Sequence, residues 1–121
     1  MAVTIASTAF VLAVPDAEAS ARWWIDELGF ELALAIESWR FVRRGACEIR
    51  LGSCPNAPAA AAIGDHSYFA YIVVDDVETL VRQIGPSVER LFALTDRPWG
   101  FREIGLRTPD GHRFMLAQPI S

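Results

Sequence analysis

Few residues of this 121-residue chain are of a type and spacing that could do chemistry. Two carboxylates stand near an arginine in the sequence: Glu48 near Arg50, and Glu103 directly after Arg102. A carboxylate in apolar surroundings could act as a general acid or base, but Glu48 and Arg50 favour an ion pair that orients a ligand or supports the fold. No Ser-His-Asp or Cys-His arrangement and no glycine-rich phosphate loop is present. All 11 Lys-or-Arg positions are Arg, which excludes chemistry through lysine.

The histidines and cysteines form no recognisable metal-binding pattern. His66 precedes a predicted strand and is interpreted as a loop or surface residue, while His112 follows a turn glycine and is interpreted as a turn or edge residue. Cys47 alternates with apolar neighbours and is predicted to be a small core residue. Cys47 and Cys54 have neither disulfide-motif nor zinc spacing, and two such thiols are typical of a reduced, intracellular protein.

Composition and charge exclude two classes of partner. Apolar residues make up 52% of the chain and charged residues 21%, which is typical of a globular domain long enough to bury a core. The net charge of −4, without a basic run, argues against nucleic acid. The apolar run at residues 9–14 is too short to cross a membrane, and no basic residue precedes Arg22. We therefore expect a cytoplasmic protein with neither a membrane nor a nucleic acid as partner.

The sequence contains an internal repeat. Residues 9–16 and 69–76 are apolar runs that each end in an aspartate, 60 residues apart. The first run predicts a strand over 3–14 and a helix that begins after Asp16 and ends at Gly29. The second predicts a strand to about residue 74 and a shorter helix that begins at Asp75 or Asp76 and stops at Gly85.

Further strands are predicted at residues 30–36, 38–44 and 46–52, and again near 90–95, 101–108 and 112–118. Each half is therefore β-α-β-β-β. We expect an α+β fold that forms a single domain over residues 1–121. Its first module spans about 1–53, a linker spans about 54–65, and its second module spans about 66–121. Four strands cannot close into a barrel, so each sheet should be half-open, with its helix on the convex side and a ligand-sized concave side.

Several motifs carry a family resemblance that covers nearly the whole chain. They are the Val14-Pro15-Asp16 strand end, the Arg-Pro-Trp-Gly-Phe-Arg-Glu run at 97–103 and the Thr-Pro-Asp-Gly-His turn at 108–112. They resemble the vicinal oxygen chelate superfamily of glyoxalases, extradiol dioxygenases and bleomycin resistance proteins, in particular its bleomycin-resistance-like branch. The resemblance implies metal-ligand positions that fall at Ala9, Arg50, Phe69 and Met115. None of these supplies a carboxylate or imidazole ligand, so we expect no metal site, no cofactor and no catalytic residue.

Strand alternation instead predicts an apolar, aromatic lining for the concave side, with a few charges. The expected ligand-binding residues are Trp39, Phe41, Glu48, Arg50, Phe69, Tyr71, Trp99, Phe101, Arg102, Glu103 and Met115. Such a lining suits an aromatic or amphipathic compound held by stacking and a few polar contacts. The hypothesis is a metal-free homodimer that sequesters a ring-bearing, antibiotic-like molecule without turnover.

Other interpretations stay open. The chain could be a diverged lyase, isomerase or dioxygenase that uses a metal held through Glu48, Glu103 or His66, or acid–base chemistry by a carboxylate. It could also be a regulatory module, although no appended domain supports this. The aromatic residues could simply fill a core or a dimer interface. Whether the modules pair within one chain or across a dimer is also left open.

Overall fold

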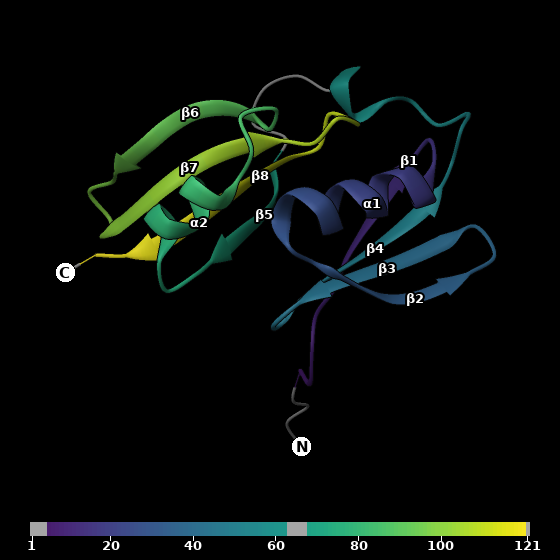
Figure 1. Cartoon of the computed structure of the whole chain (residues 1–121), viewed down its shortest axis with the longest axis horizontal. Coiled ribbons are helices and arrows are strands. Elements are labelled where there is room, and N and C mark those ends of the chain that lie inside the picture. Colours follow the sequence, from purple (N-terminus) through teal and green to yellow (C-terminus); the bar gives the residue numbers. More distant parts are fainter. Residues whose placement is uncertain (1–4, 63–67, 121) are drawn as a thin grey trace. The chain divides into compact units, whose positions relative to one another are not determined.

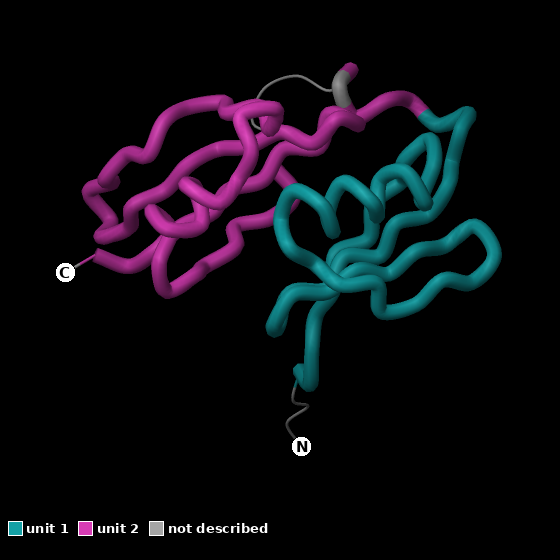
Figure 2. Tube along the Cα trace, in the orientation of Figure 1, with its two compact units in different colours: residues 1–57 teal, residues 58–121 magenta. Residues whose placement is uncertain are grey.

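The computed structural model describes residues 5–62 and 68–120, and the chain divides into two compact units, Met1–Ala57 and Pro58–Ser121 (Figure 2). Each unit has one four-stranded mixed sheet and one α-helix, arranged β-α-β-β-β, and neither sheet closes on itself (Figure 1). The predicted α+β fold of two repeated modules is therefore confirmed. None of the described helices is long and apolar enough to span a membrane.

The first unit contains β1 (Phe10–Val14), α1 (Ala17–Leu28), β2 (Glu31–Ile36), β3 (Trp39–Arg44) and β4 (Cys47–Ser53). The spatial order of its strands is β1-β4-β3-β2. β1 runs parallel to β4, and the other neighbours are antiparallel. The parallel pair requires a long crossover connection, and α1 lies within it.

α1 begins and ends where the sequence predicts. One Asp16 carboxylate oxygen accepts hydrogen bonds from the backbone N–H groups of Glu18 at 3.0 Å and Ala19 at 3.2 Å. At the other end, Gly29 takes the left-handed conformation with φ of +69°, which a residue with a side chain adopts only at a cost. Local sequence therefore sets the length of this helix.

α1 covers one face of the first sheet. Its buried stripe includes Trp24, which is 1% exposed and packs edge-on against Phe30 at a centroid distance of 5.1 Å. Leu12, Ile49 and other buried side chains of the sheet point to the same side. The exposure of β1 alternates along the strand: Leu12 and Val14 are buried, Val11 and Ala13 are exposed, and Phe10 is intermediate.

The second unit contains a short 3-10 turn (Ala60–Ala62), then β5 (Tyr68–Val73), α2 (Val77–Gln83), β6 (Glu89–Asp96), β7 (Phe101–Arg107) and β8 (Arg113–Pro119). Its strand order, β5-β8-β7-β6, repeats that of the first sheet. β5 runs parallel to β8, and the β6–β7 and β7–β8 pairs are antiparallel.

α2 has 7 residues against 12 in α1, so it is the shorter of the two helices, as the sequence predicted. Asp76 is its cap and accepts from the Thr79 backbone N–H at 3.0 Å and from the Thr79 hydroxyl at 2.7 Å. These two bonds hold the pKa of Asp76 below its usual range. Gln118 on β8 accepts from the Val77 backbone N–H at 2.8 Å and so ties the helix start to the sheet.

One predicted strand is wrong in length. The sequence predicted a strand over residues 3–14, but β1 begins at Phe10, and residues 5–9 form no regular element. The pairing with β4 starts at Phe10 and Ile49. Upstream of Ile49, β4 has only Cys47 and Glu48 before its turn. A strand needs a hydrogen-bonding neighbour, and residues 5–9 have almost none to pair with.

Candidate functional site

Each sheet has one face that its helix covers and one that faces away, which we call the open face. Cross-strand pairing assigns the side chains. In the first sheet, Val11 pairs with Arg50, which pairs with Phe41, and all three lie on the open face. In the second sheet, Tyr71 pairs with Met115, which pairs in turn with Gly105 on β7. Glu103 is two residues from Gly105 on the same strand, so its side chain lies on the same open face. The predicted lining residues that follow strict alternation are therefore on open faces.

The open face of the first sheet carries an aromatic and charged cluster. The Trp39 ring lies over Gly52, its cross-strand neighbour, where an added Cβ would come within 2.9 Å of the ring. Phe41 packs edge-on against Trp39 at a centroid distance of 6.3 Å. The Arg50 guanidinium lies 4.6 Å from the Phe41 ring centroid and donates through Nε to Glu48 at 2.8 Å. All four predicted residues of this unit are in one group.

The open face of the second sheet carries a buried carboxylate with two partners. The Glu103 side chain is 3% exposed. One of its oxygens accepts from the Tyr71 hydroxyl at 2.6 Å, and the other accepts from Nε of Arg97 at 2.9 Å. Arg97 neutralises a charge that would otherwise be costly to bury. Because both oxygens are already engaged, this arrangement does not favour Glu103 as a general base.

Aromatic rings surround this group. The Arg97 guanidinium lies 5.1 Å from the Phe92 ring centroid and 5.8 Å from that of Trp99. Phe101 packs edge-on against Tyr71 at 5.9 Å. Phe92 occupies the space above Gly105, where an added Cβ would come within 2.5 Å of the ring. Arg97 and Phe92 were not among the predicted site residues, although a glycine inside a strand signals a close approach of just this kind.

Phe69 departs from its predicted place. The pairing of β5 with β8 shifts between Tyr68 and Ala70, so Phe69 falls in a bulge. Its ring lies 5.9 Å from that of Phe114, a fully buried residue, and 6.1 Å from that of His112. The irregular register breaks the alternation that predicted Phe69 beside Tyr71. His112 follows the Thr108–Gly111 turn, in agreement with its interpretation as a turn residue.

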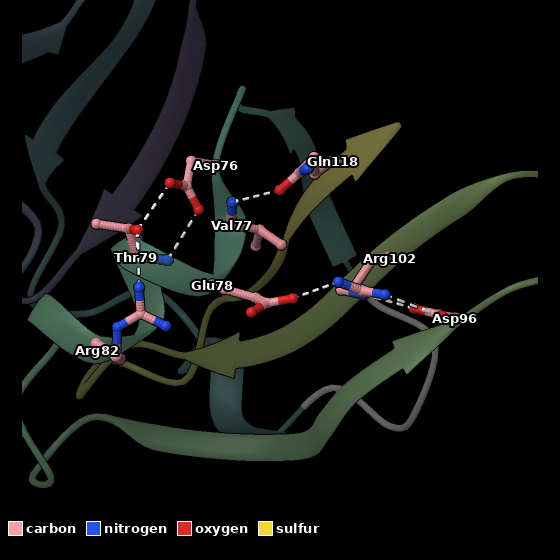
Figure 3. A network of polar contacts seen from close by, with 8 residues as sticks. All are labelled: Asp76, Val77, Glu78, Thr79, Arg82, Asp96, Arg102 and Gln118. Atoms are coloured by element: carbon pink, nitrogen blue, oxygen red, sulfur yellow. Dashed lines mark hydrogen bonds and ion pairs between the residues drawn. The ribbon is translucent and has the colours of Figure 1, made fainter. Parts of the chain in front are cut away.

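Arg102 lies on the face that α2 covers, not with the other predicted residues. It pairs with Glu78 of α2 and donates to Asp96 at 2.6 and 3.2 Å (Figure 3). Hydrogen bonds from Arg102 hold the pKa of Asp96 below its usual range. Every contact of Arg102 is therefore structural. Arg102 links the β6–β7 hairpin to α2 through these two carboxylates.

The turn that carries Trp99 is held from both faces of the sheet. Its backbone closes through the Arg97 N–H to the Phe101 carbonyl at 2.8 Å, and Gly100 takes a φ of +87°. On the helix side, Asp96 and Arg102 flank the turn, and on the open face Arg97 and Glu103 do so. These two ion pairs hold an exposed tryptophan, 61% accessible, at a defined place.

The metal positions implied by the family resemblance do not fit a divalent cation. Ala9, Phe69 and Met115 offer no oxygen or imidazole ligand, and Arg50 is itself a cation, paired with Glu48. Within residues 5–62 and 68–120, no group of three or more His, Cys, Asp or Glu side chains could hold a metal ion. His66, one of the alternatives for a displaced site, lies outside the described residues.

Tyr71 allows a test of the buried group by pH. Partial burial, followed by its hydrogen bond to Glu103, raises the pKa of the Tyr71 hydroxyl above its ordinary value. A raised folded-state pKa contributes stability that is complete below the unfolded pKa and is lost as the pH rises through the folded value. We therefore expect the phenol to titrate above its ordinary value in the Tyr68→Phe variant, followed by ultraviolet absorbance. A value at or below the ordinary one would show that Tyr71 does not donate to Glu103.

The exposed apolar side chains gather on the open faces. Large hydrophobic residues are rarely clustered at the surface of a domain without a partner. Strand pairing places six of the strongly exposed large hydrophobic residues on the open faces, and Trp99 lies in the turn between β6 and β7. The six are Val11, Leu34, Ile36, Trp39, Tyr71 and Val73.

Comparison with known proteins agrees with this architecture. Residues 4–116 match the model of the Glyoxalase/Bleomycin resistance protein/Dioxygenase superfamily. No curated protein sequence gives a significant match.

Three solved structures illustrate the likeness. A bleomycin-binding protein from Streptomyces verticillus, in complex with copper(II)-bleomycin, is 22% identical, with a TM-score of 0.73 and coverage of 99% of both chains. A bleomycin resistance determinant encoded on the transposon Tn5 is 21% identical, with a TM-score of 0.74, and the match covers 95% of this chain and 98% of that one. TnmS3, an antibiotic-binding protein from Streptomyces sp. CB03234, is 22% identical, with a TM-score of 0.69 and coverage of 96% and 99%. At these identities the likeness concerns the fold.

Proposed function

This chain belongs to the glyoxalase/bleomycin resistance protein/dioxygenase superfamily, and we propose that it binds a ring-bearing small molecule without a metal ion and without turning it over. The observation that carries the proposal is that each open face carries exposed aromatic and aliphatic side chains together with a charged pair, Glu48–Arg50 in the first unit and Glu103–Arg97 in the second. Aromatic faces offer a planar ligand stacking area, and a few polar groups fix its orientation.

The fold supports a binding role over a catalytic one. Two proteins with this fold are described as binding bleomycin or an antibiotic, and a third as a bleomycin resistance determinant. In this chain, an arginine and a methionine stand where the family resemblance implies metal ligands. The most buried carboxylate, Glu103, already accepts two hydrogen bonds. Sequestration, in which one protein captures one molecule, needs neither metal ligands nor a free catalytic carboxylate.

We also propose that the protein is a homodimer. The exposed apolar side chains of the open faces would lose contact with water if a second copy or a ligand covered them. Sedimentation of the full chain, with and without a bound compound, measures this directly. A monomer at all concentrations would contradict it.

The test of binding is a panel of planar antibiotics and dyes, followed by tryptophan fluorescence and calorimetry. We expect saturable binding of at least one compound, with one site per chain or per dimer, that a chelator does not weaken. Replacing Trp39 or Trp99 with Ala should weaken it by about tenfold through lost stacking. The Leu32→Ala variant is the control, because Leu32 is also strongly exposed but pairs with Val42 on the helix side of its sheet.

Two outcomes would contradict the proposed function. One is turnover of a panel compound at a rate proportional to protein concentration. The other is a metal content near one ion per chain after purification without chelator. That result would favour the alternative that the chain is a metal-dependent enzyme.

A further inference from the structure

The guanidinium of Arg97 has hydrogen-bond donors to spare. It uses Nε on Glu103 at 2.9 Å, and in the described part of the chain no acceptor is bonded to its terminal Nη groups. No side-chain nitrogen or oxygen of the described residues is buried without a partner, so these Nη groups reach solvent. The side chain is 33% exposed overall. The Nε edge of the Arg97 guanidinium is therefore held by Glu103, and its Nη edge is accessible to a ligand.

The neighbours of Arg97 offer an incoming molecule no acceptor of comparable strength. Both oxygens of Glu103 are engaged, and its side chain is 3% exposed. The Tyr71 hydroxyl donates its proton to Glu103. A ligand that reaches this part of the open face therefore meets N–H donors, and it must bring the acceptors itself.

The geometry of the Arg97 guanidinium favours a ligand whose hydrogen-bond acceptor is a planar group. A guanidinium whose two Nη groups are unengaged presents parallel N–H donors, which match the two oxygens of a carboxylate. The rings of Phe92 and Trp99 lie 5.1 and 5.8 Å from the guanidinium carbon, so a flat ring attached to the carboxylate would meet an aromatic surface at once. Trp99 is 61% exposed and has area to offer.

Two other arginines of the open faces, Arg107 and Arg50, lack part of this combination. Arg107 donates through both Nε and Nη2 to Glu89. Arg50 repeats the pattern beside Phe41, but its side chain is 45% exposed and that of its partner Glu48 is 21% exposed. The nearly complete burial of Glu103 holds Arg97 more firmly, which lowers the entropic cost of using it for recognition.

We propose that the Nη edge of Arg97, between Phe92 and Trp99, binds the carboxylate of an aromatic acid whose ring stacks on Trp99. This inference rests on the proposed function and names a ligand class for it. Glu103 acts as a positioning residue, because it holds the guanidinium without touching the ligand.

The test uses naphthoate and its methyl ester as probes, with calorimetry on the full-length chain. The two share the ring and the carbonyl and differ in the charged carboxylate. We expect naphthoate to bind at least about tenfold more tightly than the ester, because hydrogen bonds between charged groups are stronger than those to a neutral carbonyl. In Arg97→Gln this preference should vanish. In Arg107→Gln, which removes the same charge from the far end of β7, it should remain.

Folding and binding are separated by a further variant. Arg97→Gln could destabilise the chain through the buried Glu103, so Arg97→Gln/Glu103→Gln removes both charges together and should fold while still showing no preference. Equal binding of acid and ester, survival of the preference without Arg97, or no saturable binding of naphthoate would each overturn the inference. If other planar compounds bind while naphthoate does not, the inference fails and the proposed function stands. If no compound binds, the proposed function fails as well.

Discussion

Replacing Arg97 with Ala should lower the free energy of unfolding by about 3 kcal/mol, because the substitution leaves a buried carboxylate without its cation. Glu103 is 3% exposed at its side chain and lies 2.9 Å from Nε of Arg97. The hydrogen bond from Tyr71 survives and limits the loss, and so does the partial exposure of Arg97 itself. The expected value is therefore at the low end for a broken buried pair.

A second arginine of the same hairpin provides the control. Arg102 also forms ion pairs, but its partners Asp96 and Glu78 have side chains 54% and 48% exposed. Water solvates those carboxylates when Arg102 is removed, so Arg102→Ala should cost much less than Arg97→Ala. Urea unfolding of both variants at neutral pH measures the difference.

The double variant Arg97→Ala/Glu103→Gln identifies the cause. It removes the buried charge together with its partner, so most of the lost stability should return. If it is as unstable as Arg97→Ala alone, the loss comes from packing against Phe92 and Trp99 and not from the unpaired carboxylate. Equal costs for Arg97→Ala and Arg102→Ala would also contradict the prediction.

Replacing Trp24 with Ala should cost about 4 kcal/mol of unfolding free energy, the typical loss when a large aromatic side chain leaves a core. Trp24 is 1% exposed and is the largest fully buried side chain of the described residues. It joins α1 to the rest of the first unit through its edge-on contact with Phe30. α1 has no other residue of that size on its buried stripe.

The adjacent tryptophan is a matched control for this substitution. Trp23 lies off the buried stripe, is half-exposed and contacts Trp24 edge-on at 5.2 Å. Trp23→Ala should therefore cost clearly less. Circular dichroism during urea unfolding of the two single variants measures both losses. Equal losses for the two substitutions would mean that the buried stripe of α1 does not hold the first unit together.

The elements and their faces follow closely from local sequence. Asp16, Asp76 and Gly29 mark helix ends as predicted, because capping depends on a side chain and the few backbone groups beside it. Alternation placed Trp39 and Phe41 on one face and Val42 on the other, because successive side chains of a strand point in opposite directions. The same rule separates Arg102 from Phe101 and Glu103, and the structure follows it.

Other features depend on contacts between distant segments. The bulge that turns Phe69 toward Phe114 comes from the pairing of β5 with β8, which no pattern within β5 records. Strand β1 is shorter than the strand predicted over residues 3–14 because its parallel partner β4 begins only two residues before Ile49, the partner of Phe10. Local patterns cannot report where a partner strand begins or shifts its register, since the partner lies tens of residues away.

The sequence by itself determined the repeated β-α-β-β-β modules, the helix ends and the apolar faces, since each of these depends on neighbouring residues and backbone periodicity. Only the tertiary structure decided which charges meet. It paired Glu103 with Arg97 rather than leaving it beside Arg102, and it laid Phe92 over Gly105. These contacts depend on an irregular β6–β7 register, with shifts on either side of Phe92, and such shifts are set by packing across the sheet.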